Sequence, residues 1–291
     1  MLQAVERGNL IIIAYTFMIL GLGPLLKSFR MRMLFMALAL NIKIYLIAAI
    51  AAMLLKRRWY WAEVAIISTL LVYACSIAIY GSGSPLEILR NTRAYGTGSA
   101  QSLLDAWFAV TYDVILAGIN DGNVPLAAIV GSRNAELVEM LVPMFKLFTQ
   151  GLIAIAALAV WFRPEAVSPY RAVLLGLAMT FITTELGIYV LPFLSYFIMM
   201  ERWQGFGRIW AIVACYVLAI PVDIPLDRLP EYWQETYFKE GLAYIGTEVP
   251  LGPFVRPLII MSIAWAMAGT TIHDVFKHVY KGHGEPQKLA A

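Results

Sequence analysis

The sequence lacks most of the features that mark a soluble enzyme or a disulfide-rich secreted domain. Its two cysteines, Cys75 and Cys215, lie inside apolar runs, so neither a disulfide framework nor a cysteine-based metal site is predicted. It has no glycine-rich phosphate fingerprint of the Walker or dinucleotide-binding kind. His273, His278 and His283 recur every five residues, a spacing that does not bring side chains onto one helix face. The sequence therefore predicts no metal and no cofactor.

Charge is also scarce. Charged residues make up 14% of the 291 residues, and the formal net charge is +3. The basic residues cluster at the edges of apolar runs, so a nucleic-acid partner is not predicted. Residues 1–9 are not the basic segment that begins a signal peptide, and no cleavage site of small residues follows the next apolar stretch. A cleavable signal peptide is therefore not expected.

Apolar sequence is what the chain has in quantity, since 60% of its residues are hydrophobic and its mean hydropathy is +0.72. Several runs approach or exceed the roughly 20 residues that a membrane-spanning helix requires. We therefore predict an all-α fold, a polytopic transmembrane helical bundle that forms one integral membrane domain over residues 1–291. The predicted location is the inner or plasma membrane of the cell, with membrane lipids as partners.

The apolar runs predict five spans and two long loops rich in carboxylates. The loops, at 81–140 and 225–252, are predicted to lie outside the cytoplasm, and the basic tail 272–291 inside it. Apolar spacing favours an amphipathic surface helix over 103–116, and the aromatic residues of the second loop suit an interfacial helix. The predicted spans are residues 10–26, 59–80, 141–162, 206–224 and 253–271.

Two further apolar runs, at 33–55 and 172–200, carry polar residues near their centres and basic residues at both ends. Because lysine and arginine favour the cytoplasmic side, this pattern predicts re-entrant helical hairpins, which would place every basic loop inside. Non-helical backbone at membrane depth requires cover by protein or a wet cavity. The alternative is an ordinary span with a snorkelling lysine and one basic end on the unexpected side.

Ionisable residues inside apolar runs are candidates for function, because a charge there costs roughly 2.5–3.5 kcal/mol. Asn41 and Lys43 lie at the centre of the first run, and Glu185 lies in the second. In one interpretation Lys43 pairs with Glu185 and has only a structural role. In the other, Lys43 acts with Arg7 or Arg256 at the outer rim to bind a lipid phosphate, which lysine and arginine recognise well.

Lys146, one to two turns inside the span 141–162, completes the set of intramembrane polar residues. A catalytic carboxylate would stand in a wet pocket outside the cytoplasm, where it could take a proton from an acceptor hydroxyl. Asp105 and Asp113, both in the loop 81–140, are the predicted catalytic residues.

Four segments carry a resemblance to a known family. VERGNL at 5–10 heads a span, ALNIKIY at 39–45 and LLKRRW at 54–59 follow, and TTELGIY at 183–189 lies further on. They resemble the ERGN-type motif, the "ALKLYP … LLRRRW" segment and the segment before the late tyrosine-containing helix of the GT-C membrane glycosyltransferases in glycosyltransferase family 87. The likeness extends over residues 5–59, with Leu46 where the family has proline.

The resemblance implies a GT-C-like fold and transfer of a sugar from a polyprenyl-phosphate-linked donor, without a nucleotide sugar, on the extracytoplasmic face. It implies that Lys43 and Arg7 hold the donor phosphate, and that the acceptor is a glycan or glycolipid of the cell envelope. Family members carry further helices and a catalytic aspartate before the first motif. The resemblance therefore also predicts a truncated or split enzyme, with a partner chain that supplies the missing amino-terminal helices.

Two other functions stay open. One is a non-catalytic subunit that binds the lipid phosphate. The other is a secondary transporter, because broken helices with polar centres also build transporter sites.

Overall fold

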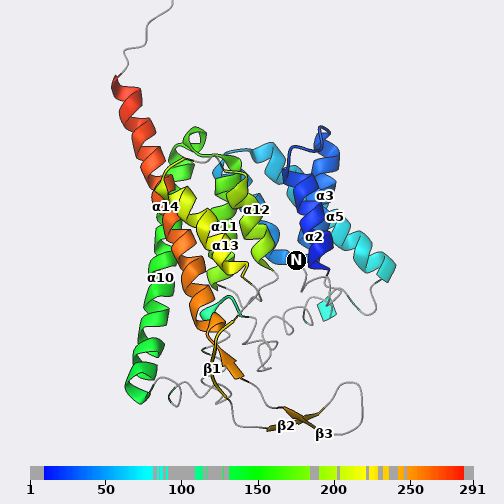
Figure 1. Cartoon of the computed structure of the whole chain (residues 1–291). Coiled ribbons are helices and arrows are strands. Elements are labelled where there is room, and N and C mark those ends of the chain that lie inside the picture. The colour runs from blue at the N-terminus through cyan, green and yellow to red at the C-terminus, as the bar shows by residue number, and fades with distance from the viewer. Residues whose placement is uncertain are drawn as a thin grey trace, which may run out of the picture.

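The described part of the chain is a bundle of α-helices with short strands at one end (Figure 1), so the predicted helical class is confirmed. The computed structural model describes residues 10–80, 84, 86–87, 90, 109–113, 116, 127, 131–183, 190–201, 204–220, 223–228, 232–235, 242–245 and 248–284. The α-helices are α2 (Ile11–Leu22), α3 (Phe29–Ile42), α4 (Ala48–Leu55), α5 (Trp59–Tyr80), α10 (Ser132–Phe162), α11 (Pro169–Thr183), α12 (Leu191–Met199), α13 (Phe206–Leu218) and α14 (Gly252–Gly284). The short 3-10 helices are η1 (Ile44–Ile47) and η2 (Pro164–Ala166).

The strands lie between α13 and α14 in two antiparallel pairs. β1 (Pro225–Arg228) pairs with β4 (Glu248–Pro250), and β2 (Tyr232–Glu235) pairs with β3 (Leu242–Ile245). The interfacial helix predicted for this loop is therefore wrong for the residues described. The physical reason is that aromatic residues favour strands at least as strongly as they favour the membrane interface, so their presence did not discriminate between the two.

Among the described residues, three helices are long and apolar enough to cross a membrane, and they identify the chain as a membrane protein. They correspond to Trp59–Ile79 in α5, Ser132–Phe162 in α10 and Gly252–Tyr280 in α14. Their outer faces are apolar, since Leu70 of α5 and Leu147 of α10 are 61% and 70% exposed. Exposed apolar surface on this scale suits lipid rather than water.

The helices at the other two predicted spans are shorter. α2 has 12 residues and α13 has 13. At about 1.5 Å per residue each covers about 18–20 Å, less than the roughly 30 Å of a bilayer core. Conversely, α10 begins at Ser132, before the predicted start at residue 141, and α14 continues to Gly284, past the predicted end at residue 271.

The apolar run 33–55 is broken near its centre. α3 ends at Ile42, Lys43 has extended backbone with φ −138° and ψ 101°, and the chain then forms η1 and α4. The two arms have different neighbours, since α3 packs on α2 and α5 whereas α4 packs mainly on α11. The run is thus interrupted at the predicted polar centre, but its arms are not packed closely on each other.

Both polar-centred runs begin and end at the same end of the bundle. Arg32 in α3 and Lys56 after α4 line one cavity, so the first run returns to the level at which it starts. In the second run, Arg171 at the start of α11 forms an ion pair with Glu201, just after α12, at 3.0 Å. The re-entrant placement of these runs in a membrane stays a prediction. We call this end of the bundle the basic end, and its residues are Arg32, Lys56, Arg58, Arg171 and Arg208.

A buried network of four charged side chains joins the helices at the basic end. Arg171 is 2% exposed and contacts both Glu201 and Asp274, the latter at 2.7 Å. Arg208, at the start of α13, lies 2.9 Å from Asp274 and 3.4 Å from Glu201. Two guanidinium groups thus face two carboxylates. The network ties α11, α12 and α13 to the carboxyl-terminal part of α14.

Close backbone approach positions α13 against α14. A Cβ atom built on Gly207 would lie 2.7 Å from the carbonyl oxygen of Ala266 and closer still to the Thr270 side chain. Only glycine therefore fits at this crossing without moving one helix.

Candidate functional site

The break at Lys43 is covered by polar contacts on one side. Lys43 is half-buried, and its backbone N–H still donates to the carbonyl of Ala39 at 3.0 Å. The Asn41 side-chain amide donates to the carbonyl of Ala37 at 2.8 Å and to that of Thr69, in α5, at 3.1 Å. Asn41, predicted as an intramembrane polar residue, therefore links the end of α3 to α5.

Aromatic side chains cover the break on its other side. The ring of Tyr45 packs edge-on against Phe181 and Phe193, with ring centroids 5.9 Å and 6.0 Å apart. Leu46, in the position where the resembled family has proline, is fully buried. Tyr45 and Leu46 thus cover one side of the interrupted backbone, whereas Ile44 beside Lys43 is 78% exposed. Such backbone at membrane depth requires cover by protein or a wet cavity.

A second polar pair lies on the far side of Phe181. Lys146 Nζ and Asp113 Oδ2 are 2.5 Å apart, and 25% and 27% of these two side chains are exposed. A cavity of about 10 Å³ is lined by both residues and by Phe181. A cavity needs about 10–15 Å³ to hold one water molecule. The two predicted site residues are brought together here, but no acceptor fits beside them in this conformation.

The segment before Asp113 is buried rather than lying on a surface. Ala109 and Val110 are at most 1% exposed, and the Tyr112 hydroxyl donates to the carbonyl of Phe254 at 2.8 Å. Burial raises the pKa of Tyr112. The predicted amphipathic surface helix is therefore wrong for this stretch. Its apolar residues and tyrosine pack against protein, which hydrophobic spacing alone does not distinguish from packing against lipid.

Arg256, predicted to assist in phosphate binding, pairs with a carboxylate. Its Nη2 atom lies 2.5 Å from Asp223 Oδ2, and Asp223 Oδ1 accepts the backbone N–H of Gly252 at 2.7 Å. Asp223 thereby connects the chain before β1 to the beginning of α14. A phosphate-binding role for Arg256 would have to compete with this ion pair.

Three of the predicted site residues, Arg7, Asp105 and Glu185, lie outside the described residues. The proposed clamp of Lys43 with Arg7 and the alternative pair of Lys43 with Glu185 both stay predictions.

Sequence reasoning missed the convergence of charge at the basic end. The pattern showed only that the second run has basic residues at both ends, whereas Arg171 and Arg208 there are buried and paired. It also did not identify the cavity between Arg32, Lys56 and Arg58. The sequence did hold a signal for this convergence. If the runs 33–55 and 172–200 both return to the side from which they start, their basic ends gather at that side.

Comparison with known proteins leaves the family open. No family model, no curated protein and no solved structure matches this sequence.

Proposed function

We propose that this protein binds a polyprenyl-phosphate-linked sugar at the break between α3 and η1, as part of a GT-C-like membrane glycosyltransferase. The observation that carries the proposal is the helix break at Lys43. It falls inside the segment 39–45 that resembles family 87, and it puts the lysine where the backbone leaves the helix. A lysine is a natural point charge for a phosphate. The pair of Asp113 and Lys146, each about a quarter exposed, lines a small cavity together with Phe181.

The same proposal has a topological part. We propose that the basic end faces the cytoplasm and that the runs 33–55 and 172–200 are re-entrant, which fits the preference of lysine and arginine for that side. The support is that both runs start and finish at one end of the bundle. The GT-C-like bundle, the number of passes and the inner or plasma membrane belong to this proposal.

Cysteine accessibility tests the topology. Lys27→Cys and Trp59→Cys flank the first run at exposed positions and would be made singly in a background without Cys75 and Cys215. Both cysteines are expected to react with a membrane-impermeant maleimide only after the cytoplasmic side is opened. Labelling of one position from each side would show that the run is an ordinary span and would refute the hairpin.

Lipid binding tests the donor site. Native mass spectrometry of the purified chain with decaprenyl phosphate is expected to show saturable binding that Lys43→Ala weakens about tenfold or more, the loss expected for a charge-assisted contact. Lys27→Ala is the matched control, because it removes an exposed lysine. Absence of binding by the wild type would refute the donor site. Binding unchanged in Lys43→Ala would assign that lysine a structural role.

Whether the chain transfers sugar is a separate question. In the proposed mechanism the donor lipid phosphate is held by Lys43, and a carboxylate takes the proton of the acceptor hydroxyl. The acceptor oxygen attacks the anomeric carbon with inversion, the bond from that carbon to the phosphate oxygen breaks, and polyprenyl phosphate leaves. Asp113 can act only if an acceptor displaces the Lys146 ammonium, because the cavity beside it holds about one water molecule. A variant Asp113→Asn that binds decaprenyl phosphate normally but transfers no sugar would assign it the role of base. A non-catalytic binding subunit would bind the lipid and show no transfer in the wild type.

A secondary transporter is the second candidate, and the geometry of the broken run favours it. Interrupted helices whose polar breaks meet inside the protein are also the usual site of substrate in transporters. The transporter would be supported if the wild type moves a solute into vesicles, Lys43→Ala abolishes this flux, and the wild type does not bind decaprenyl phosphate.

A further inference from the structure

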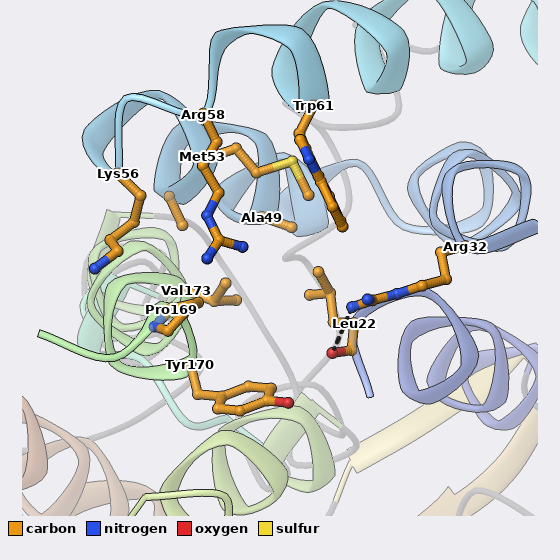
Figure 2. A pocket seen from close by; sticks show the side chains of 11 residues that line it. Leu22, Arg32, Ala49, Met53, Lys56, Arg58, Trp61, Pro169, Tyr170 and Val173 are labelled. Carbon is orange, nitrogen blue, oxygen red and sulfur yellow. Dashed lines mark hydrogen bonds between the residues drawn. The ribbon is translucent and has the colours of Figure 1, made fainter. Parts of the chain in front are cut away.

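A second cavity with a strong positive charge lies at the basic end, well away from the break at Lys43. Its volume is about 240 Å³. Its described lining includes three cationic side chains and no carboxylate, and the rest is mostly apolar (Figure 2). The cationic residues are Arg32, Lys56 and Arg58.

The two arginines are held in place by the protein. Arg32 donates from Nε to the carbonyl of Gly21 at 2.9 Å and from Nη2 to the carbonyl of Leu22 at 3.2 Å, at the end of α2. Both guanidinium groups lie beside the ring of Trp61, that of Arg32 at 5.3 Å from the centroid and that of Arg58 at 5.7 Å. Figure 2 shows the Arg58 side chain reaching down into the cavity, with Arg32 on the opposite wall. The site is therefore built before any ligand arrives.

Lys56 connects the cavity to the loop after α10. Its ammonium group donates to the backbone carbonyls of Pro164 and Val167. An ammonium has three protons to donate, so these two bonds leave capacity for a further acceptor. Burial, and next the nearby charge of Arg58, lower the pKa of Lys56, while Glu165 partly opposes this.

The ligand chemistry follows from the donors. Arginine forks recognise phosphate oxygens in pairs, and lysine adds a point charge. The phenol of Tyr170 lines the wall across from Arg58, and the apolar side chains of Met53 and Val173 complete the lining. The volume lies below the 300–1,000 Å³ that is usual for drug-sized ligands, which suits a small headgroup. The cytoplasmic leaflet, which the basic end is proposed to face, carries the anionic phospholipids of a membrane.

We propose that this cavity is a binding site for a phosphate group, presented by an anionic phospholipid headgroup or as free phosphate. The site is independent of the donor site proposed above. α4 and η1 separate Lys43 from Lys56 by 12 helical residues, which is about 20 Å along the helix axes. Failure at one site therefore does not imply failure at the other.

The test compares two arginines at opposite ends of the first run. Arg58→Gln removes a cation from the cavity, whereas Arg30→Gln removes one from an exposed position on α3 outside its lining. The purified chain in a neutral detergent would be titrated with phosphatidylglycerol and phosphatidylcholine by native mass spectrometry, and with inorganic phosphate by calorimetry. Arg58→Lys, which keeps the charge but loses the fork, is the second variant if Arg58→Gln does not fold.

The wild type is expected to bind phosphatidylglycerol saturably and in preference to phosphatidylcholine. Arg58→Gln is expected to weaken this binding about tenfold, with Arg30→Gln close to the wild type. Binding of inorganic phosphate with the same ranking of variants would identify the free anion as a ligand, and binding of the lipid alone would identify the headgroup. Equal losses in Arg58→Gln and Arg30→Gln, or saturable binding of neither ligand, would overturn the proposal.

Discussion

The ion network at the basic end makes a sharp prediction about stability. Arg171→Met removes the residue that contacts both carboxylates, Glu201 at 3.0 Å and Asp274 at 2.7 Å. Removing one partner of a buried pair costs about 3–5 kcal/mol, because the other charge stays buried and uncompensated. Arg208 still faces both carboxylates, and 28% of the Asp274 side chain is exposed, so we expect the lower value of about 3 kcal/mol.

The assay is thermal unfolding in a mild detergent, followed by tryptophan fluorescence. At about 2–4 °C per kcal/mol, Arg171→Met should lower Tm by about 6 °C or more. The control is Arg163→Met, because the pair of Arg163 with Glu165 spans 3.7 Å and about half of each side chain is exposed. Such a pair contributes little, and its loss should move Tm by less than about 2 °C.

A double variant tests the cause. Adding Glu201→Gln to Arg171→Met removes the carboxylate that was left uncompensated, so part of the lost stability should return. Equal shifts in Arg171→Met and Arg163→Met would refute the reasoning, because they would mean that the network is not buried. If the double variant is instead less stable than Arg171→Met by the full effect of Glu201→Gln alone, the loss in Arg171→Met does not come from an uncompensated carboxylate.

Two further predictions concern packing and pH. Gly207→Ala should destabilise the protein by more than about 1 kcal/mol, because the added methyl group would meet the backbone of α14. Gly151 has open space around it, so Gly151→Ala should stabilise the protein by about 0.5–1 kcal/mol. The same Tm assay compares the two variants, and equal effects would contradict the close approach of α13 to α14. The pKa of Lys56 in the folded protein is lowered from its ordinary value of 10.5, chiefly by burial and then by Arg58. Between the folded and the unfolded pKa the unfolded chain binds more protons than the folded protein, so stability rises with pH in that range. The Tm of the wild type minus that of Lys56→Met should therefore increase from pH 8 to pH 10, and a decrease would contradict the lowered pKa.

Local sequence accounts for much of the helical layout and little of the pairing between helices. Long apolar runs identify α5, α10 and α14, because length and hydropathy are properties of the run itself. The interruption at Lys43 is also a local matter, since a charge and an amide sit where a span would place them in lipid. Which helices pack together depends on how well the surfaces of helices far apart in the sequence fit each other. The packing of α4 on α11 has no counterpart in the periodicity of either segment.

The same limit applies to the polar residues. Asp113 and Lys146 were each recognisable as unusual, but their pairing across 33 residues is a long-range contact that the local pattern around either residue does not encode. Arg171 is one of the basic residues at the ends of the second run, a position that gives no sign of burial. Its burial follows only from Glu201 and Asp274, which come from the ends of two other helices.

The packing of α4 has a consequence for biosynthesis. Lys56 donates to a carbonyl that lies 108 residues further along the chain, in the turn just before α11. At a synthesis rate of about 5–20 residues per second, about 5–20 s pass before the ribosome has made that partner. During this interval the short helix and the charged break before it lack their protein cover. We therefore expect the first broken run to rest at the membrane surface or beside a chaperone, and to enter its final position only after α11 emerges.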